Sequence, residues 1–348
     1  MARVARLRYF IPYIAIGIII ADLVTVLYTV YEGPFPAVVP LGSPLAYRNI
    51  YIHPPAAFTT YIIFGLAGLA STLYLWRRDV RFSRLALYAA GLGVIYGFTT
   101  LATGIAWASE SWGAPWSWDP KQTAVLLMLL AYLGYFPLRS SIGDPERREL
   151  VSSVYLVASL SLVILSILAN RVLESLHPTG EAVRDFASDF QAGWMFGARM
   201  ILAIGTGLSI IVLSYMKTGL PRPLLTLVAI TALLSLASAV YMAAPLLEGE
   251  YYRVVNAEVG NNGLVYSVTV AKSDGSEETI IFDPPVESPV KPATTADGRP
   301  TLTGHIIVLS GDGSLRVLPH WSTPLSLALY TIAVLAGVEI ARRSGKSG

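Results

Sequence analysis

Two histidines that each precede a proline are the residues of this chain best suited to bind a metal. His53 is followed by Pro54 and His177 by Pro178, and the chain has only two other histidines. A neutral imidazole is the commonest metal ligand that proteins use. The chain has no Cys, which excludes disulfides, iron–sulfur clusters, cysteine–zinc sites and covalent capture of a cofactor by its own thiol.

A tryptophan-rich connector, residues 107–121, is the second unusual feature. It contains four of the seven Trp of the chain, and it lies between two long apolar runs. Pro115 and Pro120 remove backbone donors and Gly113 relaxes the backbone, so this stretch is not expected to form a regular helix. Trp favours the edge of a membrane, and an aromatic belt is one interpretation. So many Trp in one connector favour a flat aromatic platform for a large planar ligand.

Together, the two histidines and the connector suit a six-coordinate haem iron, with one imidazole on either side of an aromatic shelf. The alternative is that each His is an interfacial polar residue that binds nothing. Haem carries two propionates, for which Arg48 and Lys121 are the candidate cations. Each of them is also interpretable as an ordinary loop or surface charge. Arg199 and Arg184 are less constrained candidates.

Asp119 ends the connector and is followed by Pro120. This pair is typical of a helix N-cap with Pro at the first helical position. A structural role for Asp119 is therefore predicted beside any role in ligand binding. Asp22 lies inside the first apolar run, where a carboxylate is unusual, and we assign it no role.

The elements that must position these residues are membrane helices. The 348 residues are 54% hydrophobic and 14% charged, with a mean hydropathy of +0.56, whereas soluble domains have about 25% charged residues. A spanning helix needs about 20 apolar residues. The sequence predicts eight spans, with the fourth the shortest: residues 10–31, 54–76, 85–107, 121–138, 151–171, 195–216, 224–245 and 323–341.

Charge placement predicts the orientation in the cell membrane. With a cytoplasmic N-terminus, short cytoplasmic stretches hold 15 of the 25 Lys and Arg, as the positive-inside rule requires. Both termini are then cytoplasmic. The tryptophan-rich connector, both candidate histidines and the segment 246–322 lie outside.

Residues 246–322 have a different composition. Alternating or β-branched segments at 251–259, 264–271, 279–282, 304–309 and 314–317 are separated by turn sequences such as Gly260–Gly263, a pattern typical of strands. We predict a small extracytoplasmic all-β domain inserted before the last helix of an otherwise all-α polytopic membrane protein, with 284–300 as a long loop. The predicted units are a six-helix core at 1–223, a seventh helix at 224–245, the β domain at 246–322, and an eighth helix with a basic tail at 323–348.

Two segments carry a resemblance to a known family. Residues 112–121 (WGAPWSWDPK) and 47–57 (YRNIYIHPPAA) resemble the WWD motif and the first histidine segment of the CcmC/CcsA family, the haem-handling proteins of cytochrome c biogenesis. The stretch Asn170–His177 is similar to the family's second histidine site. The ending Asp119-Pro120-Lys121 is closer to the CcsA branch, and the His53 segment is closer to CcmC, the haem exporter branch.

The resemblance covers about residues 10–215 and implies a function. It implies that haem b is bound non-covalently at the outer face, with His53 and His177 as axial ligands. The aromatic platform and its basic neighbours are implied to be Trp112, Trp116, Trp118, Asp119, Arg48 and Lys121. The implied partners are a haem chaperone similar to CcmE, an ABC-transporter complex and the lipid bilayer. On this basis the protein transfers haem rather than catalysing a reaction.

Two other functions stay open at this stage. One is a CcsA-like subunit of a cytochrome c haem lyase, an enzyme that forms thioether bonds. The other is a membrane transporter for a small anion that uses Asp22 and helix ends. No motif for ATP or nucleic-acid binding is present. The roles of His305, His320 and the β domain are not assigned, although Leu318–Trp321 is similar to the haem-attachment region of CcmE.

Overall fold

Eight long helices make up most of the part of the chain that the structure describes. The structure, a computed structural model, describes residues 2–34, 47–178, 190–217, 220–248, 252–271, 275–288, 293–294, 300–302, 306–309 and 315–346. The helices are α1 (Ala2–Glu32), α2 (His53–Arg77), α3 (Val80–Ser111), α4 (Pro120–Ser140), α5 (Pro145–Val172), α7 (Phe190–Met216), α8 (Arg222–Glu248) and α9 (Ser322–Lys346), with a 3₁₀ helix η2 (Tyr47–Tyr51) before α2.

All eight are long and apolar enough to span a membrane, so the predicted multi-pass membrane protein and its eight spans are confirmed. As predicted, the fourth is the shortest, with 21 residues. The helices extend beyond the predicted apolar runs, and polar residues cap the start of three of them. Asp79, Asp119 and Asp144 each accept a hydrogen bond from a backbone N–H in the first turn of α3, α4 and α5, as N-caps do.

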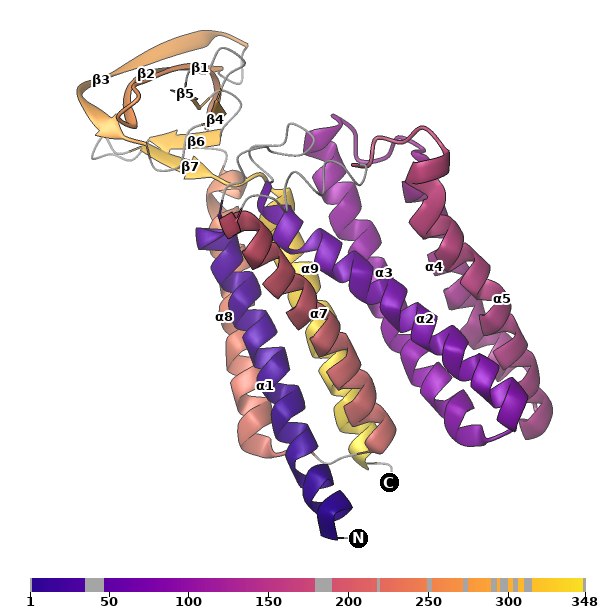
Figure 1. The fold of residues 1–348 in the computed structure, drawn as a ribbon. Helices are drawn as coiled ribbons and strands as arrows, with labels where there is room; N and C mark the ends of the chain where they lie inside the picture. Colours follow the sequence, from indigo (N-terminus) through magenta and orange to yellow (C-terminus); the bar gives the residue numbers. More distant parts are fainter. Residues whose placement is uncertain are drawn as a thin grey trace.

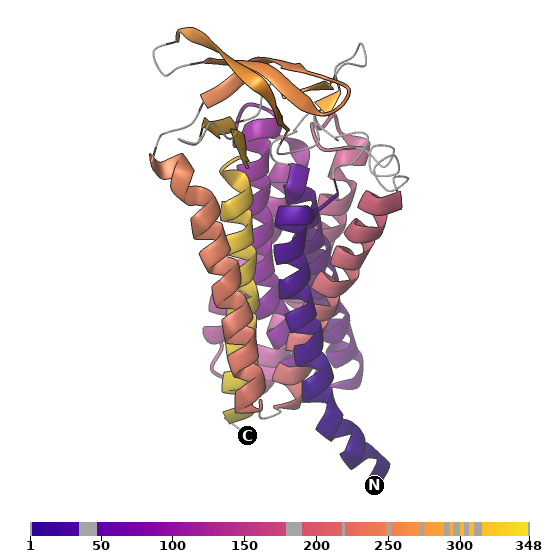
Figure 2. The same cartoon turned by 90° about the vertical axis from the view of Figure 1, so that its left-hand side faces the viewer.

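The helices form two groups (Figure 1). Helices α2, α3, α4 and α5 pack against one another, and α1, α7, α8 and α9 form the second group. Contacts of α2 with α7 and of α3 with α9 join the groups. Both termini lie at one end of the bundle and the β domain lies at the other (Figures 1 and 2). The α3–α4 connector lies at the β-domain end.

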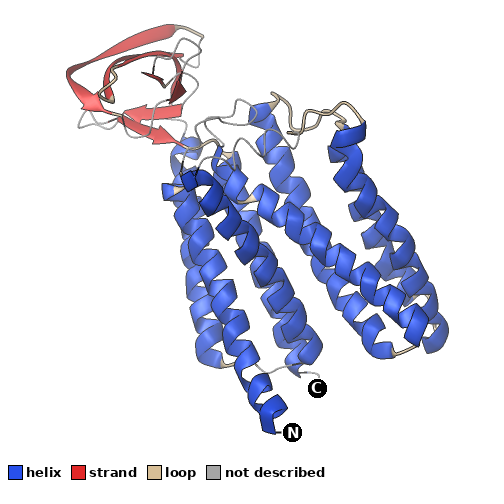
Figure 3. Cartoon of the chain, viewed as in Figure 1, coloured by secondary structure: helices blue, strands red, loops and turns tan. Residues whose placement is uncertain are grey.

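The segment before the last helix forms the predicted antiparallel sheet (Figure 3). Its strands are β1 (Tyr252–Val259), β2 (Leu264–Ala271), β3 (Glu277–Glu287), β6 (Ile306–Leu309) and β7 (Leu315–Leu318), in the order β3-β2-β1-β6-β7. A separate pair is formed by β4 (Ala293–Thr294) and β5 (Pro300–Thr301). A buried core of seven apolar residues, Val254, Val265, Val268, Val270, Leu302, Ile307 and Leu315, holds the domain together. The domain boundaries given above stay a prediction.

The predicted loop at 284–300 is wrong in part. Strand β3 continues to Glu287 through Pro284 and Pro285. Proline cannot donate to a ladder and is tolerated mainly on edge strands, and β3 is the edge strand of the sheet. The pairing with β2 is also interrupted at this point, since the register shifts between Val265 and Ser267. The short strands β4 and β5 lie in the rest of the segment.

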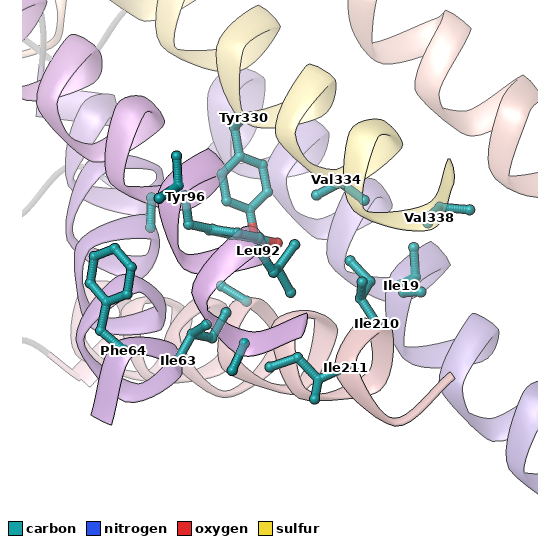
Figure 4. Close-up of a cluster of buried hydrophobic side chains, with 14 of the residues drawn as sticks. Ile19, Ile63, Phe64, Leu92, Tyr96, Ile210, Ile211, Tyr330, Val334 and Val338 are labelled. Atoms are coloured by element: carbon teal, nitrogen blue, oxygen red, sulfur yellow. The ribbon is translucent and has the colours of Figure 1, made fainter. Parts of the chain in front are cut away.

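The main core lies where the two helix groups meet. Figure 4 shows Ile19, Phe64, Leu92, Ile210 and Val334 gathered from α1, α2, α3, α7 and α9, and all are at most 1% exposed. Tyr330 of α9 and Tyr96 of α3 lie beside them, with their rings in an edge-on contact at 6.3 Å. Residues of α9 are therefore part of the core formed by α1, α2, α3 and α7.

A pair of opposite charges is buried among these helices. Asp22 of α1, to which we had assigned no role, is fully buried and forms an ion pair with Arg199 of α7, which is also fully buried. The idea that Arg199 could face a ligand carboxylate is therefore wrong, because a carboxylate of the chain itself already binds it. Arg184 lies outside the described residues, and so does His305.

Candidate functional site

The predicted site residues come from three segments of the chain. These are η2 with the start of α2, the connector between α3 and α4, and the chain that follows α5. The connector and the end of α5 lie at the β-domain end of the bundle (Figure 1). His53 lies close enough to both His177 and Lys121 to interact with them electrostatically. The fold therefore brings the two candidate histidines and one candidate cation together.

Asp119 begins helix α4. Its Oδ1 accepts hydrogen bonds from the backbone N–H of Lys121 at 2.9 Å and of Gln122 at 3.3 Å, and Pro120 occupies the first helical position. These are the donors that a helix start leaves without an intrahelical partner. The predicted N-cap role of Asp119 is confirmed.

The same carboxylate also binds the segment after α5. Oδ1 lies 2.8 Å from Nδ1 of His177, while Oδ2 accepts from the Ser175 hydroxyl and from the Leu176 N–H, each at 2.7 Å. Asp119 is only 4% exposed. Burial alone would raise the pKa of this carboxyl, but the hydrogen bonds from His177 and its two neighbours hold that pKa well below its usual range.

These contacts determine which nitrogen of His177 carries the proton. An ionised carboxylate only accepts hydrogen bonds, so Nδ1 of His177 donates to Asp119. In the neutral ring the lone pair then lies on Nε2. This is how a metal-binding histidine is usually oriented, with its second nitrogen bound to a carboxylate or carbonyl.

His53 is oriented in the same way by a different partner. Its Nδ1 lies 3.0 Å from the Thr103 hydroxyl on α3, and that hydroxyl donates to the carbonyl of Thr99 at 2.7 Å. Because the Thr103 proton is already used, Thr103 accepts from Nδ1–H of His53, and the lone pair again lies on Nε2. The ring lies against Gly104, where an added Cβ would come within 2.8 Å of its Cε1.

Two of the tryptophans lie edge-on to the candidate histidines. Trp112, which caps the end of α3, lies with its ring 4.8 Å from the ring of His177 at an interplanar angle of 73°. Its Nε1 is buried and has no hydrogen-bond partner within the described part of the chain. Trp107 lies edge-on to His53 at 5.9 Å.

The rings of Trp116 and Trp118 meet edge-on, with centroids 5.6 Å apart and an interplanar angle of 84°. These two rings therefore do not form the flat surface that the sequence predicted. Trp118 is 74% exposed and has a φ of +57°. A bulky residue with positive φ is a strained conformation, and such residues cluster at functional sites.

The two candidate cations have no carboxylate partner among the described residues. Nε of Arg48 donates to the Tyr47 hydroxyl at 2.9 Å. Nζ of Lys121 reaches the side-chain oxygen of Asn170 on α5 at 3.2 Å. Both cations thus form hydrogen bonds with neutral groups, and Lys121 also interacts electrostatically with Asp119 without forming an ion pair in the described chain. Beside Lys121, a cleft of about 610 Å³ is lined by residues 117–120, Asn170 and residues 173–176.

This donor set restricts the chemistry. Within the described ranges no group of three or more His, Cys, Asp or Glu could hold a bare metal ion. Two imidazoles with available Nε2 atoms are enough for an iron that already has four equatorial ligands from a porphyrin. The two imidazoles are therefore the donor types that would hold a haem iron from its two faces.

Two residues of this site, Thr103 and Gly104, were not predicted from the sequence. Both are ordinary residues of an apolar helix, and no local pattern distinguishes them. The contact of Asp119 with His177 joins residues 58 positions apart. The sequence predicted an N-cap role for Asp119, and the resemblance implied a place in the haem site, but neither predicted its contact with His177.

Comparisons with known proteins agree with this chemistry. A heme exporter protein C of Rhodobacter capsulatus is 35% identical over 118 residues, which is 34% of this chain and 49% of that protein. The heme exporter protein C of Escherichia coli strain K12 is 33% identical over 138 residues, 39% of this chain and 54% of that protein. A putative cytochrome c biosynthesis ccmC-like mitochondrial protein of Marchantia polymorpha is 32% identical over 114 residues, 33% of this chain and 47% of that protein.

The chain spans about half the length of these curated relatives. A profile of the family described as cytochrome C assembly protein matches residues 2–177, just over half of the 348 residues. The matched region includes η2, the tryptophan-rich connector and both candidate histidines. On this match, the chain belongs to the cytochrome c assembly protein family.

Proposed function

We propose that this protein binds haem b non-covalently at the β-domain end of the bundle and passes it to an acceptor protein for cytochrome c maturation. The proposal rests mainly on one property that two histidines share. His53 and His177 each have Nδ1 held by a hydrogen bond, which leaves Nε2 as the ligand atom. The names of the relatives, heme exporter protein C, support the same cargo.

Three further features support a haem rather than another planar molecule. Arg48 and Lys121 are cations without carboxylate partners in the described chain, as the propionates of haem require. Trp112 offers a buried Nε1–H that has no hydrogen-bond partner among the described residues and an indole ring beside His177. Trp116 and Trp118 add apolar surface at the exposed edge of the site.

Binding through two side chains also suits a carrier. Because the chain has no Cys, it cannot form a thioether bond to the vinyl groups of haem, so haem stays exchangeable. The protein then holds the cargo through two Nε2–iron bonds that an acceptor with its own ligand can replace one at a time. We propose that a haem chaperone similar to CcmE is this acceptor and that an ABC-transporter complex assists the transfer.

Spectroscopy of the detergent-purified protein tests the assignment. We expect one bound haem with the absorption and electron paramagnetic resonance spectra of low-spin iron with two histidine ligands. His53→Gly and His177→Gly should each lose the low-spin signal, and added imidazole should restore it by occupying the vacated position. The double variant should retain no haem.

His320→Gln serves as the matched control, since it changes another half-buried histidine and leaves both proposed ligands in place. Wild-type haem content and spectrum in the purified double variant would refute the ligand assignment. Formation of a covalent haem–apocytochrome product by the purified protein alone would instead identify it as a lyase.

A further inference from the structure

The backbone just before His53 has a carbonyl that its own helix cannot satisfy. In an α-helix the carbonyl of residue 51 would accept the N–H of residue 55. Position 55 is Pro, which has no N–H, and α2 begins at His53 without a side-chain cap. The carbonyl of Tyr51, two residues before His53, therefore needs a donor from elsewhere.

Arg199 of α7 is that donor. Its Nε lies 3.0 Å from the Tyr51 carbonyl oxygen, and its Nη1 donates to the backbone carbonyl of Asp22 at 3.1 Å. The guanidinium is fully buried. The Arg199 side chain thus joins the backbone of η2, at Tyr51, to the backbone of α1, at Asp22. Tyr51 lies two residues before His53, the first residue of α2.

Two more residues fix Arg199. The Asp22 carboxylate forms an ion pair with Nη1 through Oδ1, and Oδ2 accepts the hydroxyl of Tyr330 on α9 at 2.7 Å. The ring of Tyr330 lies 5.3 Å from the guanidinium carbon, within range of a cation–π contact. We name Asp22, Arg199 and Tyr330 the Arg199 clamp.

Stability alone does not account for the clamp. The desolvation of a buried ion pair costs about as much as its attraction returns, and apolar replacements are often neutral or stabilising. Here Nη2 of Arg199 is also buried without a partner among the described residues, which adds to that cost. What the arrangement provides, and apolar packing would not, is a directional bond to the Tyr51 carbonyl.

We propose that the Arg199 clamp is a positioning device for His53, and this proposal rests on the proposed haem site. By holding the Tyr51 carbonyl, Arg199 fixes the direction in which the chain enters α2, and with it the backbone that carries the His53 ligand. Asp22 and Tyr330 act through Arg199 and keep its guanidinium in the required orientation. His177 lies on a different segment and is not held by the clamp.

Two variants test the Arg199 clamp, one by a larger and one by a smaller perturbation. Arg199→Lys keeps the charge opposite Asp22 but loses the planar fork that reaches two carbonyls. Tyr330→Phe keeps the ring and removes one hydrogen bond. The matched control is Tyr132→Phe, which removes another buried tyrosine hydroxyl, bonded to the Phe64 carbonyl at 3.3 Å, away from η2.

The first measurement needs no haem. In the haem-free protein, amide hydrogen exchange across residues 47–60 should become several-fold faster in Arg199→Lys and measurably faster in Tyr330→Phe. Exchange across the first two turns of α5 should not change. Tyr132→Phe should match the wild type across residues 47–60.

The second measurement tests whether His53 binds the haem iron. With haem bound, both variants should show a reduced low-spin fraction that imidazole restores, as expected when His53 is misplaced and His177 is intact. Unchanged exchange in both variants overturns the clamp, and faster exchange with wild-type spectra overturns its role in positioning His53. If the wild type binds no haem, the proposed function fails, while the exchange data still decide whether the clamp fixes the His53 segment. If Arg199→Lys does not fold, the hydrogen-exchange and haem-spectrum measurements are both made on Tyr330→Phe alone.

Discussion

At the residue scale, Asp119 links a structural role to the proposed ligand site. Its two oxygen atoms accept five hydrogen bonds, which begin α4 and hold the segment after α5. The cap contacts are backbone bonds that any short polar acceptor could make. The contact with His177 is different, because it depends on a negative charge that fixes the tautomer of the imidazole.

Asp119→Asn separates these two roles. Asn is as good an N-cap as Asp, so the start of α4 should survive, while the charge opposite His177 is lost. Loss of such an outer contact typically costs about 10- to 100-fold in the affinity of a site for its metal. We expect haem titration in detergent to show a weakening in this range with little change in the melting temperature.

Asp144→Asn is the control for the cap. Asp144 caps α5 through the N–H of Arg147 at 2.7 Å, and no hydrogen bond or ion pair joins it to a histidine in the described part of the chain. Equal haem affinity in the two Asn variants would show that the Asp119 charge does not matter to His177.

Gly104 tests the other histidine. Gly104→Ala places a Cβ 2.8 Å from Cε1 of His53, so the ring must move, and overpacking of this kind costs about 1–3 kcal/mol. On the same helix, Gly91→Ala meets no atom closer than 3.9 Å and should gain up to about 1 kcal/mol from helix propensity.

We expect Gly104→Ala to lose the low-spin haem signal and to melt at a lower temperature, while Gly91→Ala does neither. Identical spectra and melting temperatures for the two alanine variants would mean that the His53 ring does not depend on the space at Gly104.

At the scale of elements, η2 connects the proposed site with the β domain. The side-chain amide of Asn49 donates to the Ser322 hydroxyl at 2.8 Å, at the first residue of α9. Nδ1 of His320 lies 2.8 Å from the same hydroxyl. Strand β7 ends at Leu318, so only a few residues separate the sheet from a direct contact with η2.

His320 makes this junction sensitive to acid. Burial, and then the positive charge of Arg253 on β1, lower the pKa of His320 from 6.5 to about 4. As the pH falls from about 6.5 to about 4, the unfolded chain takes up a proton that the folded chain does not, so the folded state loses stability across this window. Above about pH 6.5 the contribution of His320 to the free energy of unfolding does not change with pH. Below about pH 4 the stability that it can lose has been lost completely.

His320→Gln removes that titration and keeps a hydrogen-bonding side chain. We expect the melting temperature of the variant to fall less steeply between pH 6.5 and 4.5. In free-energy terms, the slope should become shallower by up to about 1.4 kcal/mol per pH unit, the value for one proton. Arg253→Gln should have a smaller effect in the same direction. Parallel curves for wild type and His320→Gln would exclude His320 as the titrating group.

At the scale of the whole molecule, the sequence was most informative where one physical signal dominates. Apolar length predicted all eight spans, and alternation with turn residues predicted the five strands of the main sheet. The continuation of β3 through two prolines was missed, because edge position is a property of the assembled sheet and not of the segment.

Polar contacts between residues far apart in the sequence also could not be predicted from the sequence. Asp22 and Arg199 are 177 residues apart, and each looked like an isolated charge whose partner the sequence does not name. The candidate histidines were found because their neighbours are unusual. Thr103, which orients His53, is a common residue type in an apolar helix, and no local pattern distinguishes it. Asp119 was singled out by its own context, but only the packing of the chain after α5 brings His177 to it.

The orientation of the molecule in the membrane is a prediction that the chain itself makes easy to test. Both termini lie at the end opposite the β domain (Figure 2), and the basic short loops predict that this end is cytoplasmic.

Because the chain has no Cys, single cysteines can be introduced at exposed positions without background labelling of native cysteines. In intact cells, a membrane-impermeant maleimide should label Asn261→Cys in the β domain and Ser117→Cys in the tryptophan-rich connector. Ser141→Cys, between α4 and α5, should react only after permeabilisation. Labelling of position 141 but not 117 in intact cells would invert the molecule and place the proposed haem site on the cytoplasmic side, where an extracytoplasmic acceptor could not reach it.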